Sequence, residues 1–199
     1  MPTVDRKANE KKSALDDLAS ELLDIDKSKL ERIGAGIAFD LLGPKPVRLC
    51  ITGGAGSGKT TIAGTIAERL SIPCFNFDEY IPGGYVRDAA VYQHRLVDGM
   101  SNLWDDLPPN GWIIEHVEAC NPDMVKAFNP THCLLVHPEA PFLLEVARAR
   151  GKIARDTDRA LYDREQRALE SALYAKMQYD AVPGKVVSKG KEWTLKATS

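Results

Sequence analysis

The sequence predicts a three-layer α/β/α fold with a mostly parallel five-stranded sheet, preceded by an N-terminal helical segment. Two observations predict it. Short apolar runs of strand length alternate with longer segments in which apolar residues recur at helical spacing. A glycine-rich loop also joins the first strand directly to a helix. Because parallel strands are connected through helices, this alternation favours a sheet that is covered on both faces.

Five strands are predicted, each a short apolar run bounded by turn residues. They comprise residues 47–52, 74–77, 112–117, 133–137 and 185–188, and residues 193–196 are a candidate for a short sixth strand. Between them, helices are predicted at residues 59–70, 88–107, 141–150 and 161–179.

Residues 1–44 are predicted to form a helical appendage, and residues 45–199 the main domain. Apolar residues recur at helical spacing from residue 13 to residue 42, with a break at residues 24–27, so two amphipathic helices are expected. The run Gly43-Pro44-Lys45-Pro46 ends the second helix. These helices either pack on the domain or bind a partner, including a second copy of the chain in a homodimer.

Composition restricts the partners and the compartment. The 199 residues carry a net charge of −2, so no global basic field favours nucleic acid or anionic membranes as partners. The four cysteines lack metal-ligand spacing and are expected to be free thiols. No apolar run approaches the ~20 residues that span a bilayer, and residues 1–12 lack the apolar core of a signal peptide. We therefore expect a cytoplasmic protein without a membrane partner.

The glycine-rich loop has the sequence of a phosphate-binding P-loop. Residues 53–60 read GGAGSGKT, which matches GxxxxGK[ST] between a strand and a helix. Glycines let the backbone curl around a polyphosphate, and the helix N-terminus adds partial positive charge. Lys59 is predicted to reach the β- and γ-phosphates, and Thr60 to ligate Mg²⁺. The predicted ATP-binding residues are Gly53, Gly54, Ala55, Gly56, Ser57, Gly58, Lys59, Thr60 and Thr61.

Acidic residues after the next two strands indicate which kind of P-loop protein this is. No Asn-Lys-x-Asp guanine-reading motif is present, and the third strand ends in Glu115 rather than in an Asp or Asp-Glu pair. Asp78 follows the second strand, and the carboxyl ends of parallel strands converge on one site. Asp78 is thus predicted to accept the proton of an acceptor hydroxyl, and Glu115 to hold Mg²⁺ through water. Glu79 is a weaker candidate for the base, since neighbours in an extended segment point to opposite sides.

These motifs resemble those of small P-loop kinases, particularly the uridine kinase and phosphoribulokinase-like group. Asp78-Glu79-Tyr80 is similar to the "DDFY" residues of that group, and Ile114-Glu115-His116 to its Val-x-Glu-Gly segment. Two departures are that Glu79 replaces the second Asp and His116 replaces the glycine. The resemblance implies an ATP- and Mg²⁺-dependent phosphotransferase over roughly residues 47–188.

A basic stretch after the fourth strand resembles the arginine-rich lid of these kinases. Residues 148–156 read RARGKIARD, and a lid is predicted near residues 148–160, with residues 151–157 mobile. Arginines on a closing lid neutralise charge that develops on the transferring phosphoryl group. Arg150 and Arg155 are predicted to be catalytic, although a solvated helix face explains such a charge run equally well.

The predicted acceptor pocket comprises Asp78, Tyr80, Tyr85, Arg87 and Glu118. The leading hypothesis is a kinase that phosphorylates a hydroxyl of a nucleoside- or sugar-like small molecule. Two alternatives remain, namely a kinase acting on a hydroxyl within nucleic acid and a nucleotide-dependent switch or assembly ATPase. The residues do not decide between ATP and GTP as the donor.

Overall fold

The computed structural model describes residues 27–43 and 45–198. The first of the two predicted N-terminal helices lies outside these residues. The strands are β1 (Arg48–Gly53), β2 (Cys74–Asn76), β3 (Trp112–Glu115), β4 (His132–Val136), β5 (Lys185–Lys189) and β6 (Trp193–Ala197). The helices are α2 (Lys27–Asp40), α3 (Lys59–Leu70), α4 (Ala89–Trp104), α5 (Pro122–Phe128), α6 (Ala140–Ala154) and α7 (Asp158–Ala181), with a 3₁₀ turn at Phe77–Glu79.

The six strands form one sheet in the order β2-β3-β1-β4-β6-β5. The first four strands of this order run parallel, whereas β6 is antiparallel to both β4 and β5. The predicted α/β/α fold with a mostly parallel sheet is confirmed. The candidate sixth strand is part of the sheet and separates β4 from the predicted fifth strand, which forms the edge.

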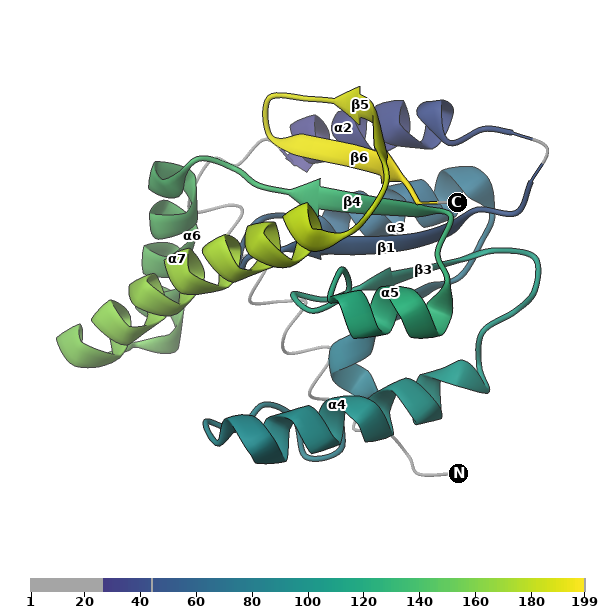
Figure 1. Cartoon of the computed structure of the whole chain (residues 1–199). Helices are drawn as coiled ribbons and strands as arrows, with labels where there is room; N and C mark the ends of the chain where they lie inside the picture. Colours follow the sequence, from purple (N-terminus) through teal and green to yellow (C-terminus); the bar gives the residue numbers. More distant parts are fainter. Residues whose placement is uncertain (1–26, 44, 199) are drawn as a thin grey trace.

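Side chains alternate between two hydrophobic cores, one on each face of the sheet. Leu49 and Ile51 of β1 lie in the core beneath α2 and α3, while Cys50 between them lies in the core beneath α4, α5 and α7. Successive strand residues point to opposite faces, which produces this division. Figure 1 shows α7 and α5 in front of the sheet and α2 and α3 behind it.

Helix α2 packs on the main domain. It lies against α3, and the side chains of Ile37, Ala38 and Leu41 are buried in the core that α3 covers. This helix therefore packs on the domain, which is one of the two arrangements expected for the N-terminal segment. Self-association of two chains through the segment stays a prediction.

Replacing Ile37 with Ala should lower the free energy of unfolding by about 2–5 kcal/mol, because it leaves a cavity in the core. Ile37 is 0% exposed, whereas Phe39 on the same helix is 75% exposed. Phe39→Ala is the matched control and should change stability by no more than about 0.5 kcal/mol. Urea denaturation measures both. If Ile37→Ala lowers the free energy of unfolding as little as Phe39→Ala is expected to, α2 does not stabilise the domain.

Three local differences from the sequence predictions have physical causes. Helix α5 was not predicted; it is short and begins at a proline, capped by the Asn121 side chain. Helix α6 continues past Gly151, where a Cβ would lie 2.7 Å from Leu161 of α7, so this glycine allows close packing of the two helices. The predicted strand at residues 74–77 is one residue shorter, because Phe77 begins the 3₁₀ turn.

All four cysteines are free thiols, with Cys74 exposed and the other three buried. Within the described ranges, no helix is long and apolar enough to cross a membrane.

Candidate active site

The P-loop bends sharply between β1 and α3. Gly56 and Gly58 adopt φ angles of 80° and 86°, a left-handed conformation that side chains disfavour. The first intrahelical bond of α3 runs from the Ile62 amide to the Gly58 carbonyl. The amides that precede Ile62 in the first turn are thus left for an outside acceptor. Such a loop with a helix N-terminus can bind a polyphosphate, and Lys59 is the first residue of that helix.

Helices α6 and α7 lie directly against this loop. The Ala55 amide donates to the Ser171 hydroxyl of α7 at 2.9 Å. A Cβ on Gly54 would lie 2.8 Å from the backbone nitrogen of Ala172, and one on Gly56 would lie 2.8 Å from Val146 of α6. The glycines of the P-loop therefore let two helices approach it, in addition to shaping its backbone.

The two predicted magnesium residues lie together. The Thr60 hydroxyl donates to the Glu115 carboxylate at 3.1 Å, and Glu115 is buried at the end of β3. A hydroxyl and a carboxylate oxygen beside a phosphate-binding loop suit Mg²⁺, which is usually held by one or two protein oxygens together with substrate phosphates and water. In residues 27–43 and 45–198, no group of three or more His, Cys, Asp and Glu side chains could hold a metal ion by itself.

Asp78 lies in the 3₁₀ turn that follows β2. Its backbone amide donates to the Asn76 side chain at 3.2 Å, and its carboxylate Oδ1 lies 3.2 Å from Nε2 of His116. The carboxylate is 58% exposed, whereas the His116 side chain is 4% exposed. The strands β2, β3 and β1 are neighbours in the sheet. Asp78 follows β2, Glu115 ends β3 and the P-loop follows β1, so all three lie at the carboxyl ends of adjacent strands.

Tyrosines and a buried carboxylate lie beside Asp78. The Tyr174 hydroxyl of α7 donates to Glu118 at 2.8 Å; burial and this hydrogen bond raise the pKa of Tyr174 to about 12, so it remains a donor at neutral pH. Burial raises the pKa of Tyr92, and the charges of Glu118 and Asp78 raise it further, which places all three groups in one region. Tyr85 contacts the Tyr92 ring edge-to-face at 5.1 Å.

The structure brings together some of the predicted acceptor residues and not others. Glu118 and Tyr85 belong to the group around Tyr92. The Tyr80 hydroxyl donates to Asp106, which follows the C-terminal end of α4, whereas Tyr92 lies in the first turn of that helix. That Tyr80 contacts an acceptor stays a prediction. Arg87 is exposed in the connection before α4. Glu79 lies in a 3₁₀ turn and not in an extended segment, so the alternation of neighbouring side chains in a strand does not apply to it.

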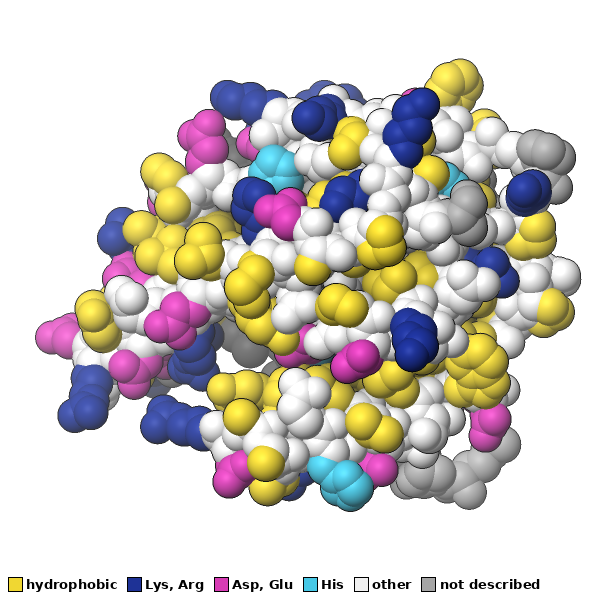
Figure 2. All heavy atoms as spheres, viewed as in Figure 1, with side chains coloured by type: hydrophobic (Ala, Val, Ile, Leu, Met, Phe, Trp, Pro, Cys, Tyr) yellow, Lys and Arg dark blue, Asp and Glu magenta, His cyan; other side chains and the backbone are white. Residues whose placement is uncertain are grey.

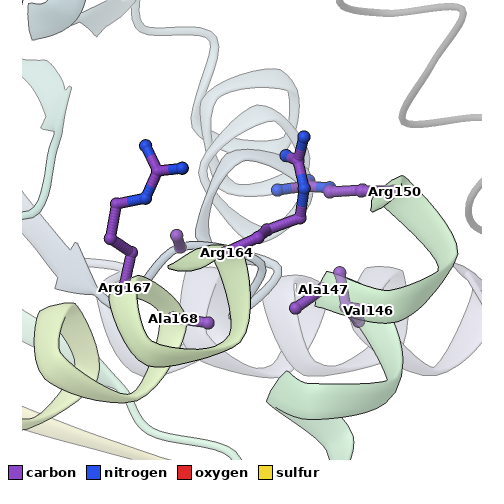
Figure 3. Close-up of a pocket in the computed structure, with 7 residues that line it drawn as sticks. Val146, Ala147, Arg150, Arg164, Arg167 and Ala168 are labelled. Atoms are coloured by element: carbon purple, nitrogen blue, oxygen red, sulfur yellow. The ribbon is translucent and has the colours of Figure 1, made fainter. Parts of the chain in front are cut away.

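A pocket of about 150 Å³ lies beside the P-loop and contains three arginines. Figure 3 shows Arg164 and Arg167 rising on the same side of α7, with Arg150 reaching toward them from α6. The other lining residues are small or apolar: Ala55, Val146, Ala147 and Ala168. Arg164 also pairs with Asp156 at 2.7 Å. Whole ligands need pockets of roughly 300–1,000 Å³, so this one suits a single anionic group of a larger molecule.

Only one of the two predicted catalytic arginines of the lid lines this pocket. Arg150 lines the pocket, but Arg155 is not among its lining residues and instead ends α6 at φ 55°. Arg148 pairs with Glu165 at 2.5 Å on the surface. Helix α6 includes residues 148–154, so most of the predicted lid is helical. That residues 151–157 move on ligand binding stays a prediction.

Sequence reasoning missed Arg164 and Arg167 as site residues. A signal for them was present, because Arg164, Ala168 and Ser171 recur at helical spacing on one side of α7. That side contacts the P-loop through Ser171. Small residues there allow the close approach, and Arg164 and Arg167 line the same pocket as Ala55 of the loop. The spacing indicates a helix but does not tell which element the helix faces.

The chain is similar in structure to proteins whose structures have been solved. A crystal structure of a shikimate kinase from Bacteroides thetaiotaomicron is similar over 66% of this chain and 82% of that chain, with 22% sequence identity and a TM-score of 0.47. No family model and no curated protein sequence matches the chain.

Proposed function

We propose that this protein is an ATP-dependent kinase that transfers the γ-phosphoryl group to a hydroxyl of a small molecule, nucleoside-like or sugar-like. The observation that carries the proposal is the convergence of three parts at the ends of adjacent strands. These are the P-loop with Lys59, the Thr60–Glu115 pair and the Asp78 carboxylate. A P-loop alone also suits an ATPase, whereas an exposed carboxylate beside it suits the activation of an acceptor hydroxyl.

Each group has a role that follows from its chemistry. Lys59 and the loop amides hold the phosphates, and Thr60 with Glu115 would hold Mg²⁺, which supplies charge neutralisation when bound. Asp78 accepts the proton of the attacking hydroxyl. Arg150, Arg164 and Arg167 stabilise negative charge on the phosphate oxygens, because guanidinium groups bind phosphate through paired hydrogen bonds. Glu118, Tyr92 and Tyr85 would contact the acceptor.

The resemblance to uridine kinases and phosphoribulokinases motivates the choice of nucleosides and sugars as first acceptors. Nucleic acid as the acceptor is less favoured on the basis of charge. Figure 2 shows acidic and basic side chains interspersed on the visible face, without the continuous basic band that tracks a nucleic-acid backbone.

The function is tested by measuring ADP formation with ATP and Mg²⁺ alone and with separate pools of nucleosides, sugars and oligonucleotides. A kinase for small molecules should release ADP much faster with one of the first two pools than without an acceptor. Stimulation by oligonucleotides alone would favour the nucleic-acid kinase. Turnover that no acceptor changes would favour a switch or assembly ATPase, and the same assay with GTP identifies the donor.

Replacing Arg150 with Ala should lower kcat for transfer by about 10²-fold, since it removes a charge contact that is strongest in the transition state. The Kd for ATP should change much less. Arg155→Ala is the matched control: this arginine lies five residues away and does not line the pocket, so kcat should fall far less than in Arg150→Ala. Steady-state kinetics and nucleotide titration measure these effects. A larger loss for Arg155→Ala than for Arg150→Ala would contradict the assignment of the pocket.

A further inference from the structure

His116 is a buried histidine whose tautomer is fixed by the backbone. The Glu118 amide donates to Nδ1 of His116 at 3.1 Å. An amide N–H can only donate, so Nδ1 must be the acceptor, and the neutral ring carries its proton on Nε2. The ring is also held by edge-to-face contact with Phe77 at 5.4 Å. Its own backbone amide bonds to the Ile51 carbonyl of β1.

The protonated nitrogen of this ring faces Asp78. Nε2 lies 3.2 Å from Oδ1 of Asp78, so its N–H donates to the carboxylate. The Asp78 backbone is held separately by the Asn76 side chain. The Asp78 carboxylate is 58% exposed, and a donor on a buried, fixed ring favours the rotamer that this hydrogen bond requires.

We propose that His116 is a positioning residue that orients the Asp78 carboxylate toward the acceptor hydroxyl. The hydrogen-bond chain runs from the Glu118 amide through the imidazole to Asp78, and it links the ends of β3 and β2. The effect on catalysis rests on the proposed kinase function, whereas the hydrogen-bond chain itself does not. A reacting group displaced by about 1 Å can cost on the order of 10²-fold in rate.

The hydrogen-bond chain is tested in the full-length protein by two-bond ¹H–¹⁵N correlation spectra of the histidine side chains. The His116 signals are identified by their loss in His116→Gln. The expected spectrum shows Nδ1 unprotonated and Nε2 protonated, and Asp78→Asn should shift the Nε2 proton while the other histidines stay unchanged. A ring protonated on Nδ1, or signals that do not respond to Asp78→Asn, would overturn the proposal. This result does not depend on any enzymatic activity.

The catalytic consequence is tested with two amide substitutions that separate the two ring nitrogens. The amide nitrogen of His116→Gln reaches about as far as Nε2 and keeps a donor for Asp78. His116→Asn places its oxygen near Nδ1 and loses that donor. His116→Asn should lower kcat by about 10²-fold with little change in the KM for ATP, and His116→Gln should recover most of the loss. Equal losses in two folded variants would indicate a purely structural role.

A double-mutant cycle with Asp78→Asn completes the test. If His116 acts through Asp78, His116→Asn should cause almost no further loss of kcat in the Asp78→Asn background. Additive losses would contradict the positioning role. If His116→Asn does not fold, the spectra of the wild type and of Asp78→Asn still test whether the His116 ring donates to Asp78. A wild type that transfers phosphoryl to no acceptor would contradict the proposed function and leave the spectroscopic result intact.

Discussion

Replacing Asp78 with Asn is expected to lower kcat for phosphoryl transfer by about 10²–10⁴-fold, the range typical of general-base catalysis. Asn keeps the shape of the side chain but cannot accept the proton of the acceptor hydroxyl. ATP binding should be nearly unchanged, because Asp78 lies on the side of the site formed by β2 and is not part of the P-loop. Single-turnover kinetics and ATP titration separate the two quantities.

Glu79→Gln is the matched control for this substitution. Glu79 is the adjacent acid in the same 3₁₀ turn, and it is Asp78 that bonds to His116. The control should therefore retain most of the wild-type kcat. Another combination of results would reassign the roles of Asp78 and Glu115. An inactive Glu115→Gln together with a nearly normal Asp78→Asn would exchange the roles of base and magnesium residue.

Replacing Lys59 with Ala should lower the rate of transfer by about 10²–10³-fold while the fold remains intact. Lys59 begins α3 at the P-loop and is predicted to contact the β- and γ-phosphates, where charge develops in the transition state. Lys126→Ala serves as the control, because Lys126 is an exposed lysine in the last turn of α5. Steady-state kinetics, with circular dichroism to verify folding, measure the effect. Wild-type turnover in a folded Lys59→Ala protein would refute the assignment of the P-loop.

The fold and the strand–loop–helix context of the glycine-rich loop were predictable from the sequence because their signals are local. The motif at residues 53–60 requires a strand before it and a helix after it, and the alternation of Leu49, Cys50 and Ile51 assigns each side chain to a face of the sheet. The pairing of Thr60 with Glu115 follows from the same logic, since Glu115 ends β3 and Thr60 lies in the first turn of α3, which the P-loop joins to the adjacent parallel strand β1.

The acceptor side was less predictable because it depends on contacts between distant segments. Tyr80 follows a 3₁₀ turn rather than an extended segment, and its hydroxyl bonds to Asp106, a residue 26 positions along the chain. The position of Arg164 in the pocket depends on which helix packs on the P-loop, and no residue near it in the sequence specifies that. The sequence shows His116 only as a departure from glycine, whereas in the structure its ring bonds to both the Glu118 amide and the Asp78 carboxylate.

The most direct test of the kinase assignment is the fate of the γ-phosphoryl group. The protein would be incubated with ATP labelled at the γ-phosphorus, Mg²⁺ and the acceptor that most stimulates ADP formation. We predict that the label appears on a hydroxyl of that acceptor in an amount equal to the ADP formed, and that Asp78→Asn abolishes this product. Label released only as inorganic phosphate, at the same rate with and without any acceptor, would contradict the account.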